Sequence, residues 1–179
     1  IMGQDSAEWF DVVDARDRVL RSERRAVVHR ERLFHRAVHI LLTDEHGRIL
    51  LQKRSLTKDT CPGAWTTSAS GHVDAGEDYG PAAVRELQEE LGLEVEGPEA
   101  VEFLFAHRPH RYTGNEFIRV YRLLWDGSPL CANPEEVTDL AWCSPEELDA
   151  GIARERRSFT PSLRLIWELY RTRLAQAVS

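Results

Sequence analysis

Three glutamates, Glu86, Glu89 and Glu90, lie close together in a segment that is rich in helix-forming residues. Because a helix has 3.6 residues per turn, their spacing places the three carboxylates on one face. Like charges on adjacent turns repel one another and weaken an isolated helix. A hard divalent cation such as Mg²⁺ prefers oxygen ligands and would neutralise the cluster. The alternative is an acidic helix face that is only solvated.

The residues around these glutamates carry the start and stop signals of a helix. Asp78 can cap the N-terminus, and Pro81 fits the first turn, where a missing N–H group costs little. Residues 82–91 contain strong helix formers, and Gly92 is suited to end the helix. Apolar residues recur at helical spacing: Val84, Leu87 and Leu91. They should pack against a sheet while the glutamates face a cleft.

The same segment resembles the Nudix box, the signature of a family of hydrolases. The box reads G-x5-E-x7-R-E-U-x-E-E-x-G-U, in which U is a bulky aliphatic residue. Every specified position is matched: Gly71, Glu77, Arg85, Glu86, Leu87, Glu89, Glu90, Gly92 and Leu93. A chance match is on the order of 10⁻⁸ per starting position at ordinary residue frequencies, so the resemblance is specific. It implies the Nudix fold, an α/β (α+β) architecture in which a mixed β-sheet lies between helices.

The resemblance also implies an activity, the hydrolysis of a diphosphate (P–O–P) bond. The substrate would be a nucleoside di- or triphosphate or a metabolite linked to a nucleoside diphosphate. The cofactor would be Mg²⁺ or Mn²⁺, which neutralises phosphate charge and activates water. Four residues would hold the metal ions, the first through its backbone carbonyl: Gly71, Glu86, Glu89 and Glu90. Arg85 would pair with Glu77 and fix its orientation; the alternative is an ordinary surface ion pair.

The residues from Gln52 to His72 are similar to one branch of this family, the type I isopentenyl-diphosphate isomerases and their hydrolase relatives. By that resemblance, Arg54 and Lys58 would contact the diphosphate; the alternative is two exposed basic side chains. Four more residues fall at or near positions where the isomerases bind a metal ion: His29, His35, His72 and Glu116. A single histidine is more often a core or surface residue than a ligand, so the histidine roles stay open.

Departures from the isomerase pattern favour hydrolysis. The isomerases carry a reactive cysteine where this chain has Ser70, and a serine hydroxyl is far less acidic than a thiol. Their box is degenerate at the positions of Glu86 and Glu89, and one of their acidic metal ligands is replaced here by Gly114. We therefore expect a hydrolase. The alternatives are an isopentenyl-diphosphate isomerase and a non-catalytic Nudix-fold module that binds a nucleotide or a partner protein.

The general base is not fixed by the box, because Nudix enzymes take it either from the box or from a later strand or loop. Glu116 begins an expected strand, so its side chain could reach the cleft, and it is our candidate. Glu86 is the alternative within the box, and Glu102 is less well placed.

Composition predicts one domain spanning residues 1–179. The chain is 42% hydrophobic, which is enough for a substantial core. A net charge of −7 argues against nucleic-acid binding, and no apolar run approaches the length of a membrane span. Three cysteines without close pairing indicate free thiols and a reducing, cytoplasmic location: Cys61, Cys131 and Cys143. The expected partner is a small-molecule diphosphate, with a nucleotide favoured, and both a monomer and a homodimer fit the sequence.

Within this domain, residues 1–33 are expected to hold a strand at 9–14 and a basic segment at 22–32. The basic segment is either a solvated connection or a lip that attracts an anionic substrate. Residues 34–179 form the core, with strands expected at 37–43, 48–52, 65–70, 100–106, 116–124 and 139–142.

Two helices are expected near the end of the chain. Ser144 and Glu147 form a capping box for a short one, and Thr160–Pro161 opens the last. The last helix carries an apolar stripe that should be core: Leu163, Ile166, Trp167, Tyr170 and Leu174. Four aromatic residues are available to contact a base, although their spacing selects none: Phe34, Trp65, Phe105 and Tyr112.

Overall fold

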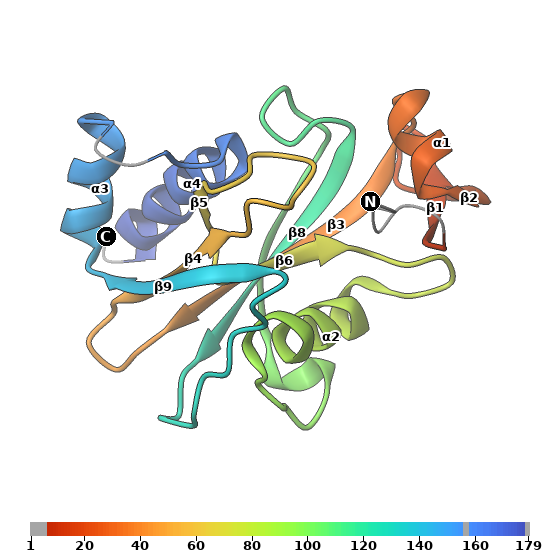
Figure 1. The fold of residues 1–179 in the computed structure, drawn as a ribbon. Coiled ribbons are helices and arrows are strands. Elements are labelled where there is room, and N and C mark those ends of the chain that lie inside the picture. Colours follow the sequence, from red (N-terminus) through yellow and green to blue (C-terminus); the bar gives the residue numbers. More distant parts are fainter. Residues whose placement is uncertain (1–6, 156–157, 178–179) are drawn as a thin grey trace.

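Helices lie on both faces of one mixed β-sheet (Figure 1). The computed structural model describes residues 7–155 and 158–177, so predictions for residues 1–6 fall outside it. The seven-stranded sheet consists of β3 (His35–Thr43), β4 (Ile49–Arg54), β5 (Trp65–Thr66), β6 (Ala69–His72), β7 (Glu102–His107), β8 (Glu116–Leu124) and β9 (Val137–Cys143). A short 3₁₀ helix, η1 (Pro98–Ala100), precedes β7.

Strands β3 and β4 separate next to β6, the strand that carries Gly71 of the box. The strand order is β5-β4-β3-β8-β7, with β6 paired to β3 and β9 paired to β4. β3 and β8 are parallel, whereas the other pairs are antiparallel. In the described residues β3 and β4 pair at Thr43 and Ile49, and then each takes another partner. β3 continues with β6, which carries Gly71 and His72, and β4 continues with β5.

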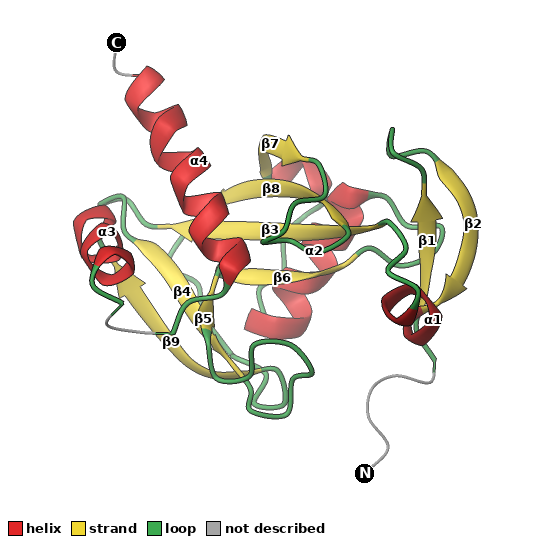
Figure 2. Cartoon of the chain, turned by 90° about the horizontal axis from the view of Figure 1, so that it is seen from above, coloured by secondary structure: helices red, strands yellow, loops and turns green. Residues whose placement is uncertain are grey.

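Figure 2 shows α4 (Pro161–Ala177) in front of the sheet and α2 (Tyr79–Leu91) behind it. One cluster of buried apolar side chains joins α4 and α3 (Pro145–Ala153) to the sheet. A second cluster joins α2 to the opposite face, because alternate residues of a strand point to opposite sides. The mixed sheet between helices, expected from the Nudix resemblance, is confirmed.

The box helix begins and ends where its signals predict. Asp78 accepts a hydrogen bond from the N–H group of Tyr79, and Gly92 ends the helix with a left-handed φ of 65°. Leu87 and Leu91 are fully buried against the sheet, while Val84 is only half-buried. The expected amphipathic helix therefore fixes which way its glutamates can point.

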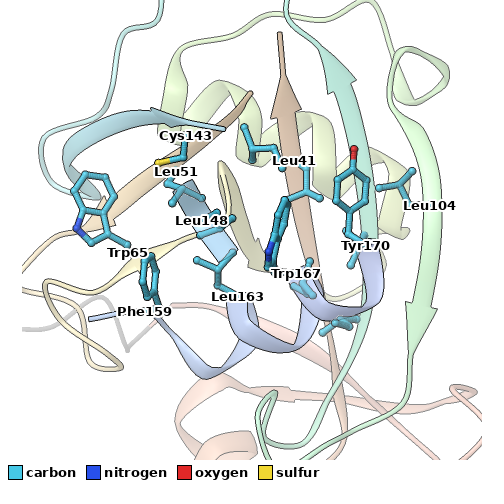
Figure 3. Packing of buried hydrophobic residues seen from close by; sticks show 14 of the residues in the cluster. Leu41, Leu51, Trp65, Leu104, Cys143, Leu148, Phe159, Leu163, Trp167 and Tyr170 are labelled. Carbon is cyan, nitrogen blue, oxygen red and sulfur yellow. The ribbon is translucent and has the colours of Figure 1, made fainter. Parts of the chain in front are cut away.

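The last helix packs through the predicted apolar stripe. Leu163, Trp167 and Tyr170 lie against residues of the sheet, among them Leu41 and Leu51 (Figure 3). The capping box of Ser144 and Glu147 is present at the start of α3. No helix in the described part of the chain is both long and apolar enough to cross a membrane.

Residues 22–32 are not an irregular connection, because regular elements occupy this region; the alternative, a basic lip that attracts an anionic substrate, stays a prediction. β1 (Trp9–Val13) forms a two-stranded sheet with β2 (Val19–Arg24), and α1 (Arg25–Arg30) follows. Nearly all residues of β2 are exposed, so its sequence lacks the apolar alternation that indicates a strand. The helix buries only Val28, so it has no apolar stripe either.

The strand expected at 65–70 is in fact two strands, β5 and β6, separated by Thr67 and Ser68. The buried Ser68 hydroxyl accepts a hydrogen bond from the N–H group of Leu42 at 2.7 Å and donates to the carbonyl of Leu50 at 2.6 Å. One side chain thus links β3 to β4 where the strands separate. The strands expected at 100–106 and 139–142 are present as β7 and β9 with shifted ends.

Candidate active site

A cavity of about 700 Å³ brings together side chains from α1, α2, β3, β6, β8 and the loop after β4. Nearly all the site residues expected from the sequence line it: Arg54, Lys58, Gly71, Arg85, Glu86, Glu89, Glu90 and Glu116. The three histidines, His29, His35 and His72, also line it. Glu77 is not part of the lining and reaches the site through Arg85.

The acidic helix face is divided between buried and exposed carboxylates. Glu86 and Glu90 are 8% and 4% exposed, whereas the Glu89 side chain is 53% exposed. The N–H group of Ser70 donates to Oε1 of Glu90 at 2.8 Å, and the Gln52 amide donates to Oε2. Two donors therefore fix the Glu90 carboxylate at the wall of the cavity.

Glu86 fills space that exists because residue 71 is glycine. A Cβ atom at Gly71 would lie 2.0 Å from Oε1 of Glu86, so the two cannot coexist without a shift. Burial, together with the charge of Glu90, raises the pKa of Glu86 well above its ordinary value. Two adjacent buried carboxylates are unfavourable when ionised, and a divalent cation would offset their repulsion. This donor set fits Mg²⁺ or Mn²⁺.

Arg85 connects the acidic residues of the box. Its guanidinium binds Glu77 in a bidentate pair, with Nε–Oε1 and Nη2–Oε2 distances of 3.0 and 2.9 Å. The same group donates to Glu86 at 2.7 Å and to the carbonyl of His72 at 2.9 Å. The Arg85–Glu77 pair expected from the sequence is thus present, and it belongs to a network that orients Glu86.

The three histidines form a second group of donor atoms in the same cavity. Nitrogen atoms of His29, His35 and His72 all lie within 4.8 Å of one another. Nδ1 of His35 is 2.9 Å from the carbonyl of Leu33, and a carbonyl can only accept, so this nitrogen carries the proton. Nε2 of His35 is then an acceptor, and it is buried without a hydrogen-bond partner.

Glu116 completes this second group. Its Oε1 lies 3.1 Å from Nε2 of His72 and 3.7 Å from the orphaned Nε2 of His35. This nitrogen and the carboxylate are both acceptors, so neither can donate to the other. A cation between them would bind both. The donor set of three imidazoles and one carboxylate fits a borderline ion such as Zn²⁺ or Mn²⁺.

The contacts of Glu116 bear on its expected role as general base. Burial alone would raise the pKa of Glu116, but the neighbouring imidazoles of His35 and His72 hold it below its usual range. A carboxylate with a low pKa is a weak base. The geometry therefore favours a ligand role, and the role of general base stays a prediction.

Both basic residues expected to bind the diphosphate already have partners. The Arg54 guanidinium donates to the carbonyl and hydroxyl oxygens of Thr60, at 3.0 and 3.2 Å. Lys58 forms an ion pair with Glu136, which also lines the cavity. Glu136 was not expected from the sequence, because its partner is far away along the chain and no motif marks it.

Two aromatic residues lie at the site, and only one of them was among the expected candidates. Tyr112 lines the cavity with its ring under the Arg111 guanidinium. Phe10 of β1 was not expected at the site; its ring centroid lies 4.5 Å from that of His72 and 5.8 Å from that of His35. Trp65 and Phe105 belong to the α4 side of the core.

Comparisons with known proteins identify the family and the fold of the chain. A family model described as NUDIX domain matches residues 33–163. An isopentenyl-diphosphate Delta-isomerase of Serratia proteamaculans (strain 568) is 37% identical over 154 residues, which cover 86% of this chain and 86% of that protein. A protein of Salmonella typhi named Uncharacterized Nudix hydrolase YfcD is 34% identical, over 96% of this chain and 89% of the relative. The crystal structure of DR0079 from Deinococcus radiodurans matches with a TM-score of 0.78 and 30% identity, over 91% of this chain and 99% of that one.

Proposed function

Because this chain belongs to the Nudix family, we propose that it uses a divalent metal ion to hydrolyse a P–O–P bond. The substrate class is a nucleoside di- or triphosphate or a metabolite linked to a nucleoside diphosphate. The observation that supports this best is the pair of buried carboxylates, Glu86 and Glu90, in a cavity that also holds Arg54 and Lys58. Such a cavity offers ligands for a cation and positive charge for phosphate.

In this proposal each residue of the acidic group has a distinct task. Mg²⁺ or Mn²⁺ supplies neutralisation of phosphate charge and activation of water. The ion is held by Glu86, Glu89, Glu90 and the carbonyl of Gly71. Arg85 orients Glu86 by donating a hydrogen bond to its carboxylate. Arg54 and Lys58 bind the diphosphate, exchanging part of their present contacts for phosphate oxygens.

The histidines and Glu116 would hold a second ion in the same cavity. The orphaned Nε2 of His35 supports this assignment, since buried polar atoms are normally satisfied. Isomerase activity is the second candidate function, because this group resembles the metal site of the isomerases and more than one similar protein bears that name. Ser70 opposes it, since a hydroxyl cannot replace a reactive thiol in moving a proton on carbon.

The decisive experiment measures release of phosphate or nucleoside monophosphate from a nucleotide panel, with Mg²⁺ and with chelator. We expect metal-dependent turnover in the wild type. Loss of a residue that only hydrogen-bonds a metal ligand typically lowers activity by roughly 10- to 100-fold. Glu90→Gln alters a proposed ligand itself, so its kcat should fall by more than that. Full activity in both Glu89→Gln and Glu90→Gln would contradict the mechanism.

The same preparation separates the alternatives. Conversion of isopentenyl diphosphate to its isomer would identify an isomerase, and binding without turnover of any panel member would identify a binding module. The homodimer and the cytoplasmic location stay predictions, and sedimentation of the purified chain would test the first of them.

A further inference from the structure

A second cavity, of about 380 Å³, lies between the turn that joins β1 to β2, the start of α2, and strands β7 and β8. It shares no lining residue with the catalytic cavity. Glu116 and Phe117 are neighbours on β8, so their side chains point to opposite sides of the strand. Glu116 lines the catalytic cavity, and Phe117 lines the second one.

Three arginines line this second cavity: Arg16, Arg108 and Arg119. Asp17 is the single carboxylate residue in the lining, and both of its oxygens are occupied. Oδ1 accepts from Nε of Arg36 at 2.7 Å, and Oδ2 accepts from the Tyr79 hydroxyl at 2.8 Å. Within the described part of the chain, none of the three arginines forms an ion pair with a carboxylate. The cavity is therefore positive, although the whole chain carries a net charge of −7.

Arg119 is held in place by aromatic rings. Its guanidinium carbon lies 4.2 Å from the centroid of the Tyr79 ring and 5.9 Å from that of Phe103. The Tyr79 ring is itself fixed, because Arg36 stacks on it at 5.2 Å and Asp17 binds its hydroxyl. Stacking uses the face of a guanidinium and leaves N–H groups at its edge to donate. An arginine held in this way loses little conformational entropy when it binds an anion.

We propose that this cavity binds the phosphate group of a small molecule. Several arginines around one concavity suit an anion with several oxygens and more than one negative charge. The volume admits a phosphate together with part of the group that carries it. The source is either free inorganic phosphate or a phosphomonoester such as a nucleoside monophosphate. The inference does not depend on the proposed hydrolase activity, because no catalytic residue takes part.

The test is a titration of ¹⁵N-labelled full-length chain with inorganic phosphate, at constant ionic strength and with chelator present. Amide resonances of Ala106 and Arg119 report the second cavity, and those of Ser70 and Gly71 report the catalytic one. We expect saturable shifts at Ala106 and Arg119. A parallel titration with AMP distinguishes the sources, since tighter binding of AMP would show that the nucleoside contributes.

Arg16 and Arg108 are exposed, so the double variant Arg16→Gln/Arg108→Gln should fold normally. Loss of two charge-assisted contacts should weaken phosphate binding by about tenfold or more. Arg122→Gln is the matched control, because Arg122 also lies on β8 but pairs with Glu102 outside the cavity. Its affinity should match the wild type. Absence of saturable shifts at Ala106 and Arg119, or equal affinity in the double variant, would overturn the proposal.

Discussion

Glu90 receives hydrogen bonds from two strands, through the Gln52 side chain on β4 and the backbone N–H group of Ser70 on β6. Gln52 also donates to the carbonyl of Ser68, so both N–H groups of its side-chain amide form hydrogen bonds. Because Gln52 is 1% exposed, it has little freedom to move. Gln52 lies outside the acidic helix and acts through its hydrogen bond to Glu90. It is therefore a positioning residue for this proposed metal ligand.

Replacing Gln52 should therefore weaken metal binding without removing any proposed ligand. In Gln52→Ala we expect Mn²⁺ affinity to fall by about 10- to 100-fold, as is typical when an outer-shell partner is lost. Electron paramagnetic resonance of free Mn²⁺ measures this affinity without any substrate. Gln88→Ala removes an exposed amide from α2 and serves as the control, with unchanged affinity. Equal affinity in the two variants would show that Gln52 does not orient the ligand.

At the scale of elements, the loop before β9 is attached to the acidic helix. The N–H groups of Cys131 and Asn133 donate to the carbonyls of Leu91 and Glu90, at 2.8 and 3.0 Å. These bonds satisfy carbonyls that a helix C-terminus leaves free. They also set the position of Glu136, whose carboxylate binds Lys58 in the loop after β4. Two loops and one helix thus form the side of the candidate active-site cavity that holds Lys58.

This ion pair should couple the two loops energetically. The Lys58 and Glu136 side chains are 21% and 17% exposed, so solvent screens them only partly. In a double-mutant cycle of Lys58→Met and Glu136→Gln, we expect a coupling energy of about 1–2 kcal/mol. Urea unfolding measures it. Glu135→Gln, at an exposed position next to Glu136, should leave the free energy of unfolding unchanged. Strictly additive effects of the two substitutions would refute the coupling.

Elements with local signals could be predicted from the sequence, and elements without them could not. The caps and apolar stripes of α2 and α4 lie within each helix, so both were found. β2 has no buried face, and its hydrogen-bond partner β1 is what makes it a strand. Propensity alone does not indicate such a strand.

The same distinction applies to the candidate site. The box residues are close in sequence, and their spacing on one helix predicted a shared face. Phe10, Gln52 and Glu136 reach the site through contacts with residues far away along the chain, namely His72, Glu90 and Lys58. A single sequence contains no record of such contacts. Resemblance to the isomerases anticipated the positions of the histidines, but only the fold showed that His29 lies with the other two.

At the scale of the whole molecule, both cavities are formed by segments that are distant in the sequence, so the sites depend on the complete fold. The three cysteines are free in the structure, so none of them cross-links this arrangement. Stability rests on the two clusters on either side of the sheet. A buried titratable group in this interior makes the stability depend on pH.

His39 is such a group, since burial lowers its pKa from 6.5 to about 4. Between these values the unfolded chain takes up a proton and the folded chain does not, so stability falls as the pH falls through this range. From pH 7 to pH 5 the loss due to His39 should be about 2 kcal/mol. Urea unfolding at the two pH values, with chelator present, measures the total change.

Other groups also titrate in this range, so the His39 contribution is the difference between wild type and His39→Gln. Glutamine does not titrate, and its amide can keep a hydrogen bond to Thr67, the partner of His39. The variant should lose less stability on acidification than the wild type. The same loss in both proteins would mean that His39 is protonated in the folded state.

The parallel pairing of β3 with β8 has a consequence for biosynthesis. β8 emerges from the ribosome long after β3, and α4, which covers that face, emerges later still. Pairings between such distant segments make folding slower than in proteins built from local contacts. Until β8 arrives, His35 has no Glu116 beside it, so a nascent chain would offer the proposed second ion an incomplete set of donors. If the proposed ion binds there, its loading should follow translation of most of the polypeptide.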